Sequence, residues 1–523
     1  MTETTTVRSG QRTGSGAGRR AALAGVVATV LVAVGSWIPS LWTDEAATIS
    51  AATRSLSELW RMVHTIDAVH GTYYLLMHAW IAVAGQSELA LRAPSAVAVG
   101  FGTAGVYLLA ARLGPRTNAA VAAGAFVLLP RVAWMGIEAR PFAFATAAGV
   151  WATVVLLLAL RDDRTRWWVL YGALVAVAIL FNLYLVLLVA AHLDSLLLTR
   201  RTERALLVRW FVAAGVGVAV TLPMVAAALG QSGQIGEAPR SLTELARNVA
   251  VNQWFLGETP TVYSRSGAVE AGSTGIHPWQ VGSVLLALGV VVLVVLALVR
   301  AWRARPADAR TTQLLAWALP WVVVPTLVIA AYAVVSNTYS PRYLAFTAPG
   351  VALLIAFGLD SLRRPALQVV VAAVLVSLAV PVLVSQRTEN AKSGSDWRQV
   401  AERVSTQAGP GDGVYFSPRY PPTGAEVRLT TRGVAVAYPD PFAGLVDLTR
   451  RTTPTQAGDL LGTSSTLEDA VAALDGVDDV VVVRRHDYPA DAAAADDATL
   501  VSAGFARTET WSGVLDEVVT FRR

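Results

Sequence analysis

Residues 21–54 read AALAGVVATVLVAVGSWIPSLWTDEAATISAATR, a long apolar run followed by two adjacent acids. The apolar part is about as long as the roughly 20 residues that an α-helix needs to cross a bilayer core. Asp44 and Glu45 follow it closely, so we expect the pair at the boundary between lipid and water. An ionised carboxylate there can take a proton from an incoming hydroxyl group, as a general base does. Thr43 or Asp44 can equally cap a helix over residues 45–54, since acids stabilise the positive end of a helix.

The composition is that of a polytopic membrane protein. Of 523 residues, 54% are hydrophobic and 15% are charged, and the mean hydropathy is +0.50. Long apolar runs recur along the chain, which soluble proteins rarely show. The net charge is +5, but the basic residues cluster in short loops, so they indicate membrane topology and not a nucleic-acid surface. The chain has no cysteine, which excludes disulfides and thiolate metal sites.

The N-terminal segment precedes the first apolar run. Residues 1–18 are rich in Gly, Ser and Thr, a composition typical of disorder. Arg19 and Arg20 then resemble the basic start of a signal peptide, but the apolar run is long and no small-x-small cleavage site follows it. We therefore predict a disordered cytoplasmic N-terminus, residues 1–20, and a retained membrane anchor.

A transmembrane domain is predicted over residues 21–385. The run from 167 to 198 is too long for one straight span, and Asn182 near its middle predicts a break. The eleven candidate spans are residues 21–39, 91–113, 118–133, 141–160, 167–181, 183–198, 208–230, 281–301, 314–335, 343–359 and 366–385.

The topology depends on residues 72–84, TYYLLMHAWIAVA, which are apolar but short for a crossing. If this segment does not cross, all arginine clusters fall on the side of the N-terminus. The positive-inside rule therefore favours an interfacial or re-entrant helix, with a cytoplasmic N-terminus. The first loop (40–90), the loop over residues 231–280 and the C-terminal tail then face outward. The clusters are Arg19/Arg20, Arg112/Arg116, Arg161/Arg164/Arg166, Arg200/Arg201/Arg204/Arg209, Arg300/Arg303/Arg305/Arg310 and Arg363/Arg364.

A soluble, extracytoplasmic α/β domain is predicted over residues 386–523, where lipid-length runs stop and charged residues return. At about 130 residues it is long enough for a core of its own. Neither GxGxxG nor GxxxxGK[ST] occurs, so no nucleotide-binding motif accompanies the alternation of helices and strands. The predicted elements are helices over 395–406 and 467–474, strands over 413–416 and 480–484, and a hairpin over 505–522.

The order of several motifs resembles the GT-C superfamily of membrane glycosyltransferases. The resemblance is densest over residues 40–165, and the nearest branch looks like the protein O-mannosyltransferases, the lipid A aminoarabinose transferases and the actinobacterial membrane mannosyltransferases. The tail also looks like the outward domain of many bacterial members. The motifs are Asp-Glu after the first span, HGTYYLLMHAW (70–80), ELALRAPSAV (88–97), IEARPFAFA (137–145), SPRYLAF (340–346) and, in the tail, SDWRQVAERV (395–404).

The resemblance implies an all-α membrane domain that moves a sugar from a polyprenyl-phosphate donor to an acceptor hydroxyl on the outer face. Asp44 matches the proposed catalytic base of the family, and Glu45 its acidic neighbour. Glu138 and Arg140 match the EAR motif, and Arg342 matches a basic position near the donor phosphate. Alternatively, Glu138 and Arg140 can satisfy charges between helix ends. Arg342 can instead anchor a span at the interface. His70 lies where relatives have HPPLYY or EKPPLYY, and the paired prolines and the lysine are absent here.

Three further residues of the first loop are candidate substrate contacts. Asp67 and His70 are three positions apart, so they can share one helical face. They could provide a second carboxylate, a phosphate contact or half of a metal site, but no third ligand is evident, so no metal is assigned. Tyr74 is assigned to the same site, with an interfacial aromatic belt as its alternative.

These patterns predict a multi-pass plasma-membrane glycosyltransferase that inverts the anomeric carbon and needs no cofactor or nucleotide. Its expected partners are a polyprenyl-phosphate sugar, membrane lipids and an extracytoplasmic glycan, lipoglycan or protein acceptor, without nucleic acid. The resemblance favours mannose, with arabinofuranose as the nearest alternative. Lys392 is the single lysine in an Ala-, Val- and Arg-rich chain, which is typical of GC-rich actinobacteria. A lipid-linked sugar transporter or flippase is the alternative from another class, and it predicts charges deep within the spans.

Overall fold

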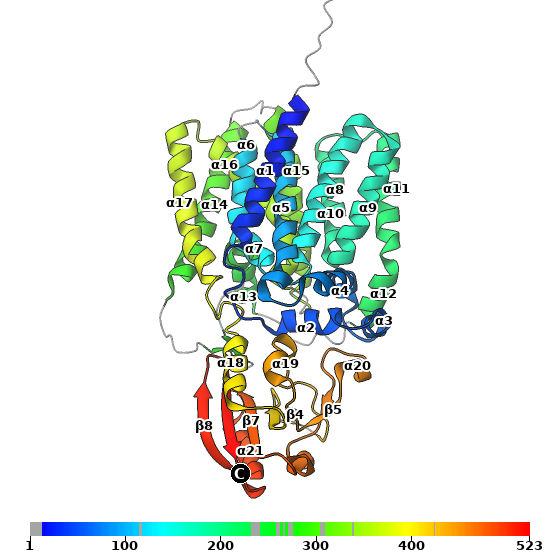
Figure 1. Cartoon of the computed structure of the whole chain (residues 1–523). Helices are drawn as coiled ribbons and strands as arrows, with labels where there is room; N and C mark the ends of the chain where they lie inside the picture. Colours follow the sequence, from blue (N-terminus) through cyan, green and yellow to red (C-terminus); the bar gives the residue numbers. More distant parts are fainter. Residues whose placement is uncertain are drawn as a thin grey trace, which may run out of the picture.

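The computed structural model describes residues 13–114, 118–231, 241–257, 262–264, 267–269, 276–303, 309–336, 339–422 and 424–523. These residues form a helical bundle and a smaller C-terminal sheet domain at one end of it (Figure 1). The fold class predicted from the sequence is therefore confirmed. The predictions for residues 1–12, for Arg116 and Arg305, and for much of the loop over 231–280 lie outside the described residues.

Seven helical segments of the described chain are long and apolar enough to cross a membrane. They correspond to predicted spans because an uninterrupted apolar run satisfies its backbone hydrogen bonds within one helix. Residues 13–20 were predicted to be disordered, but they form the first turns of α1, so that prediction is wrong. Once a helix has formed in an apolar run, it extends into adjacent residues at little cost in free energy. The seven are α1 (Thr13–Ala33), α5 (Glu88–Leu113), α8 (Phe142–Asp162), α14 (Pro278–Arg303), α15 (Ala309–Tyr332), η5 (Pro341–Thr347) with α16 (Ala348–Asp360), and α17 (Pro365–Ser385).

The remaining predicted spans are bent or short helices. The pair α6 (Asn118–Leu128) and α7 (Pro130–Gly136) bends by 67°, and the pair α11 (Arg204–Val220) and α12 (Leu222–Gly230) bends by 46°; counting each pair as one span gives up to nine spans. Proline at the start of α7 explains the first bend, because it lacks the N–H that would continue the helix.

The predicted break at Asn182 separates α9 (Thr165–Phe181) from η2 (Leu183–Leu185) and α10 (Val186–Leu198). The Asn182 amide donates to the Tyr343 carbonyl at 2.8 Å and accepts from the Tyr184 N–H at 3.0 Å. Its side chain thus replaces hydrogen bonds that the broken helix loses.

Three short helices lie across the end of the bundle, between it and the C-terminal domain (Figure 1). They are α2 (Thr43–Ala52), α3 (Leu56–Thr65) and α4 (Gly71–Ala84), with the 3₁₀ turn η1 (Ala68–His70) before α4. At 14 residues α4 rises only about 21 Å, less than the roughly 30 Å of a bilayer core. It contains the segment predicted not to cross.

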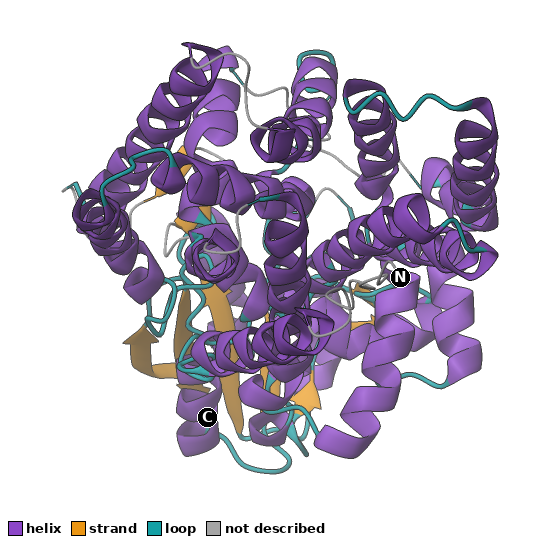
Figure 2. Ribbon diagram, turned by 90° about the horizontal axis from the view of Figure 1, so that it is seen from above, coloured by secondary structure: helices purple, strands orange, loops and turns teal. Residues whose placement is uncertain are grey.

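The C-terminal domain has a mixed five-stranded sheet with the order β4-β3-β7-β9-β8. Strand β3 is parallel to both its neighbours, whereas β9 is antiparallel to β7 and β8. Figure 2 views the bundle helices from above, with the strands of this sheet beneath them. The predicted helices and strands are present, but residues 468–474 form a 3₁₀ helix. The elements are α18 (Trp397–Gln407), β3 (Gly413–Phe416), α19 (Gly433–Ala437), η6 (Asp440–Phe442), β4 (Val446–Asp447), η7 (Glu468–Leu474), β7 (Asp479–Arg485), α21 (Ala490–Ser502), β8 (Ala506–Ser512) and β9 (Asp516–Arg522).

Smaller elements complete the described chain. They are α13 (Leu242–Arg247), the π-helix η4 (Asn248–Leu256), the paired strands β1 (Val262–Ser264) and β2 (Gly267–Val269), the paired strands β5 (Arg450–Thr452) and β6 (Thr463–Ser464), and α20 (Pro454–Ala457). The two domains share one hydrophobic core: Trp397 and Val434 of the tail belong to the same buried cluster as Leu41 and Ala46 near the first acids. The C-terminal domain is therefore packed directly on the end of the bundle that carries α2.

Candidate active site

Helix α2 carries Asp44 in its first turn. The helix begins at Thr43, two residues earlier than predicted, and Trp42 is its N-cap without a side-chain capping bond. The predicted alternative, a cap by Thr43 or Asp44, is therefore wrong. The Asp44 carboxylate instead turns to Arg342, whose Nη1 donates to Oδ2, and Arg140 Nε lies 3.9 Å from the same oxygen.

Arg342 lies at the start of η5, 298 positions after Asp44 in the sequence. Its guanidinium lies 5.8 to 5.9 Å from the ring centroids of Trp42, Phe142 and Tyr343, within the range of cation–π attraction. The side chains of Asp44 and Arg342 are both 22% exposed, so this ion pair remains accessible from outside the protein.

Arg140 is held by a network from the first loop. Its Nη1 donates to Tyr74 Oη at 3.3 Å, and its Nη2 lies 3.1 Å from His70 Nε2. A guanidinium group only donates, so His70 Nε2 must accept and Nδ1 must carry the proton. His70 Nδ1 then donates to Asp67 Oδ1 at 2.5 Å, and the Tyr74 hydroxyl donates to Asp67 Oδ2. The network runs from Arg140 through two neutral side chains to one carboxylate.

Asp67 adopts a backbone conformation that is uncommon for residues other than glycine. Its φ is +61° and its ψ +34°, in the left-handed region, immediately before η1. Such conformations persist where the surrounding contacts overdetermine them, as at binding and active sites. The hydrogen bonds from His70 and Tyr74 supply such contacts here.

The charges in this cluster keep Asp44 ionised and His70 neutral. Burial by itself would raise the pKa of Asp44, but Arg342 and Arg140 hold that pKa below its usual value. Burial and the neighbouring Arg140 lower the pKa of His70. Burial by itself would raise the pKa of Asp67, but His70 and Arg140 hold that pKa below its usual value. At neutral pH the site therefore contains two carboxylates, two guanidinium groups and an uncharged imidazole.

Glu45 has a different environment from its neighbour Asp44. Its carboxylate is fully buried and accepts from Arg92 Nε at 2.8 Å and Arg92 Nη2 at 2.6 Å, and from the Ala139 N–H at 3.1 Å. Arg92 Nη1 also donates to the carbonyls of Ser36 and Pro39 at 2.6 and 2.7 Å. This arrangement joins the end of α1, α2, α5 and the turn before α8, and Glu45 does not share the exposed site of Asp44.

Glu138 is also enclosed. The residue has no exposed surface, and its carbonyl accepts from the Ser95 hydroxyl at 2.7 Å. Of the eight predicted site residues, six thus come together around Asp44, while Glu45 and Glu138 lie in the buried layer behind them. The six are Asp44, Asp67, His70, Tyr74, Arg140 and Arg342.

Two contributors were not singled out as site residues from the sequence. Arg92 anchors Glu45, and the signal was present, because an arginine inside a predicted span needs a buried partner. Trp42 flanks Arg342, but a tryptophan beside a span is equally typical of the membrane interface, so its position alone did not indicate a role.

The cluster of Asp44, Arg140 and Arg342 is suited to binding a negatively charged substrate group. Two guanidinium groups converge on one partly exposed carboxylate, and arginine binds phosphate through paired charge-assisted hydrogen bonds. Within the described residues, no group of three or more His, Cys, Asp and Glu side chains is placed to hold a metal ion. The site thus offers an ionised base beside a receptor for negative charge.

The chain is similar to one protein-family model and to solved structures of membrane enzymes. A family model described as dolichyl-phosphate-mannose-protein mannosyltransferase matches residues 72–227. ArnT from Cupriavidus metallidurans, solved with undecaprenyl phosphate, superposes with a TM-score of 0.54 at 14% identity, covering 95% of this chain and 97% of ArnT. The apo form of ArnT gives 0.53 at 14%, covering 96% and 98%.

A second solved protein is similar at a lower level. The oligosaccharyltransferase AglB from Archaeoglobus fulgidus, in complex with an inhibitory peptide and a dolichol-phosphate, gives a TM-score of 0.48 at 11% identity, covering 88% of this chain and 69% of AglB. No curated protein matches the sequence significantly. The chain therefore shares the overall fold of ArnT, and residues 72–227 match the mannosyltransferase family model.

Proposed function

We propose that the protein transfers a sugar from a polyprenyl-phosphate donor to a hydroxyl group, with Asp44 as the general base. The observation that carries the proposal is the placement of an ionised, partly exposed carboxylate between Arg342 and Arg140. The match to a mannosyltransferase family model, and the undecaprenyl phosphate bound to the structurally similar ArnT, support the donor class.

The reaction requires one proton transfer and one displacement. Asp44 takes the proton of the acceptor hydroxyl, and the resulting oxygen attacks the anomeric carbon of the donor. The bond from that carbon to the phosphate oxygen breaks, and polyprenyl phosphate leaves with the electron pair. A single direct displacement inverts the anomeric carbon, and one well-placed base contributes about 10²- to 10⁴-fold in rate.

The guanidinium groups bind the departing phosphate in this proposal. Negative charge on the leaving oxygens increases as the bond breaks, so donors already aimed at them stabilise the transition state. Without donor, Asp44 provides the anion that Arg342 binds; on donor binding, the phosphate shares or replaces that contact, which leaves Asp44 free to accept the proton. Asp67, His70 and Tyr74 position Arg140 through the network described above.

The finer assignments belong to this proposal as well. Mannose is the expected sugar, and arabinofuranose is the alternative that a pentosyltransferase would use. The site and the C-terminal domain are expected on the extracytoplasmic side, with glycan, lipoglycan or protein as acceptor. The enclosed Glu45 and Glu138 are expected to maintain the site and not to touch the substrate.

The test is transfer by the purified protein in lipid, supplied separately with polyprenyl-phosphate mannose and polyprenyl-phosphate arabinofuranose. We expect transfer from one donor and a loss of about 10²- to 10⁴-fold in kcat with Asp44→Asn. The exposed Asp475 provides the matched control, since Asp475→Asn removes a carboxylate far from the site. Wild-type activity in a correctly folded Asp44→Asn protein would refute the assignment of the base. Movement of the intact donor across the bilayer without transfer would identify a transporter instead.

A further inference from the structure

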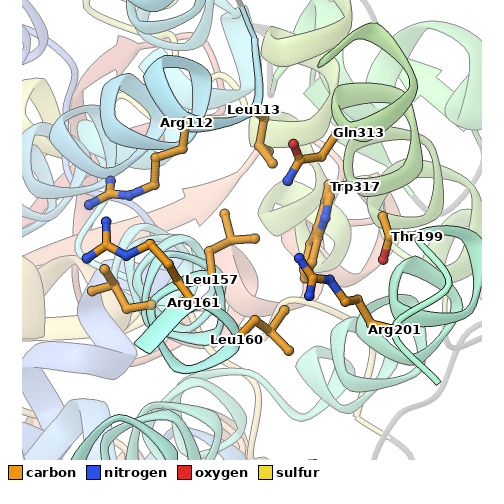
Figure 3. A pocket seen from close by; sticks show the side chains of 10 residues that line it. Arg112, Leu113, Leu157, Leu160, Arg161, Thr199, Arg201, Gln313 and Trp317 are labelled. Atoms are coloured by element: carbon orange, nitrogen blue, oxygen red, sulfur yellow. The ribbon is translucent and has the colours of Figure 1, made fainter. Parts of the chain in front are cut away.

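A basic cavity lies at the opposite end of the bundle from Asp44. It lies between the ends of α5 and α8, the segment that follows α10, and the first half of α15 (Figure 3). Both α5 and α8 begin near the Asp44 site, and α5 alone is 26 residues long, or about 39 Å. The two sites are therefore separated by roughly the thickness of a membrane.

The cavity is apolar on one side and strongly basic on the other. Its volume is about 250 Å³, so it suits a headgroup and the start of its chain more than a whole lipid. Trp317 and Leu113 on the apolar side are 3% and 1% exposed. The polar side consists of Gln313, Thr199 and three arginines, and none of the ten lining residues is acidic. The lining residues are Arg112, Leu113, Leu157, Leu158, Leu160, Arg161, Thr199, Arg201, Gln313 and Trp317.

The described residues balance the positive charge of this cavity only in part. Arg161 pairs with the adjacent Asp162 at 2.7 Å. Arg112 donates to the Leu108 carbonyl of its own helix at 3.3 Å, and neither Arg112 nor Arg201 forms an ion pair with any described residue. In Figure 3 the guanidinium groups of Arg112 and Arg161 lie close to each other. Like charges in proximity repel, so a bound anion would stabilise the arrangement.

We propose that this cavity binds the phosphate headgroup of an anionic phospholipid in the leaflet opposite the Asp44 site. The arginines bind the phosphate oxygens by charge-assisted hydrogen bonds, and the surface of Trp317 and the leucines holds the first carbons of the lipid chain. Basic pockets between helix ends at one membrane face are suited to such headgroups because the phosphate lies at that depth. The assignment is independent of the proposed transferase activity.

The experiment measures lipid retention by the full-length protein. Protein purified in detergent is stripped of lipid, then titrated with phosphatidylglycerol, with phosphatidylcholine and with inorganic phosphate, and binding is followed by native mass spectrometry and thermal unfolding. We expect retention of phosphatidylglycerol and an increase in Tm, with no comparable effect of phosphatidylcholine. Arg112→Gln and Arg201→Gln should each weaken phosphatidylglycerol binding by roughly tenfold or more, as loss of a charge-assisted hydrogen bond does.

The matched control is Arg303→Gln, which removes an exposed arginine at the end of α14, outside the cavity. It should leave phosphatidylglycerol binding unchanged. Equal binding of both lipids, or equal losses in Arg303→Gln and Arg112→Gln, would overturn the proposal and identify arginines that merely extend to the interface. Inorganic phosphate that binds as tightly as phosphatidylglycerol and raises Tm as much would overturn the lipid assignment in favour of a soluble phosphate compound. Binding by Asp44→Asn protein should equal that of the wild type, so a failed transferase proposal would not affect this outcome.

Discussion

At Asp44 the ionisation state depends on cations contributed by distant parts of the chain. Burial opposes the charged carboxylate, and Arg342 and Arg140 more than offset that effect. Arg140 is in turn oriented by His70 and Tyr74, which both donate to Asp67. A carboxylate that is ionised well below neutral pH is available throughout the physiological range, but its lowered pKa also makes it a weaker proton acceptor.

The first prediction at the residue scale concerns pH. The pKa of Asp44 is lowered, so the acidic limb that Asp44 contributes to kcat/KM should lie below the ordinary aspartate value of about 3.9. Arg140→Gln removes one of the cations that lower this pKa. The acidic limb of the profile should therefore move to higher pH, which a pH–rate series on both proteins measures. Arg428→Gln, at an exposed ion pair, is the control. An unchanged limb in Arg140→Gln would mean that Asp44 does not titrate in this profile.

At the scale of elements, α2 positions the proposed base, Asp44. It bears Asp44 on its accessible side, whereas the next residue, Glu45, is enclosed by Arg92 from α5. Arg92 also donates to carbonyls of the segment between α1 and α2, so one guanidinium links α5, α2 and that segment. The two adjacent acids thus differ in their proposed roles. Asp44 faces the proposed substrate, and Glu45 holds α2 in place through Arg92.

Replacing Glu45 should therefore cost stability. Glu45→Gln leaves Arg92 buried without its counter-charge, and breaking a fully buried ion pair typically costs about 3–5 kcal/mol. Thermal unfolding in detergent should show a clear decrease in Tm, whereas Glu402→Gln on α18 should not. The double variant with Arg92→Gln should lose less than the sum of the two single losses, because the residues are in direct contact. Additive losses would contradict the pairing.

The effect should also depend on pH. Burial opposes ionisation of Glu45, but Arg92 and Lys392 hold its pKa below the usual value. The contribution to stability is therefore present above the ordinary glutamate pKa of about 4.3 and is lost as pH falls through the lowered value. The difference in Tm between wild type and Glu45→Gln should accordingly shrink only in strong acid.

At the scale of the whole molecule, the C-terminal domain is fastened to the end of the bundle that carries the site. Arg398 of α18 donates to Glu88 Oε1 at 2.7 and 3.0 Å, and to the carbonyls of Trp37 and Ile38 at 2.8 and 3.0 Å. The Tyr438 hydroxyl donates to the same Glu88 oxygen at 2.9 Å. These contacts fix the C-terminal domain to the segment after α1 and to the start of α5.

Loosening this attachment should expose the connection between the domains. Arg398→Ala removes four hydrogen bonds, but its side chain is 25% exposed, so solvent reduces their value to about 1 kcal/mol. Limited proteolysis after residue 386 should then accelerate roughly three- to tenfold. Arg403→Ala, which breaks an ion pair inside the C-terminal domain, is the control and should not have this effect. Equal cleavage rates would indicate that apolar packing around Trp397 suffices.

The fold class and much of the site followed from the sequence because their signals are local. Apolar runs predict membrane helices from length alone, and the hairpin over β8 and β9 appears as alternation around a tight turn. The acid pair and the EAR and PRY motifs identified Asp44, Arg140 and Arg342 as candidate site residues. Nothing in the local sequence predicted that these three side chains are in contact.

By itself, the sequence determined a polytopic helical protein with a C-terminal α/β domain and predicted that the acids lie at its membrane boundary. Tertiary structure alone decided that Asp44 faces Arg342, 298 positions away, while Glu45 faces Arg92. The physical reason is that a helical register points adjacent side chains in different directions, and their partners depend on how distant helices pack. The division of two like acids into an accessible base and a buried anchor is thus a property of the folded chain.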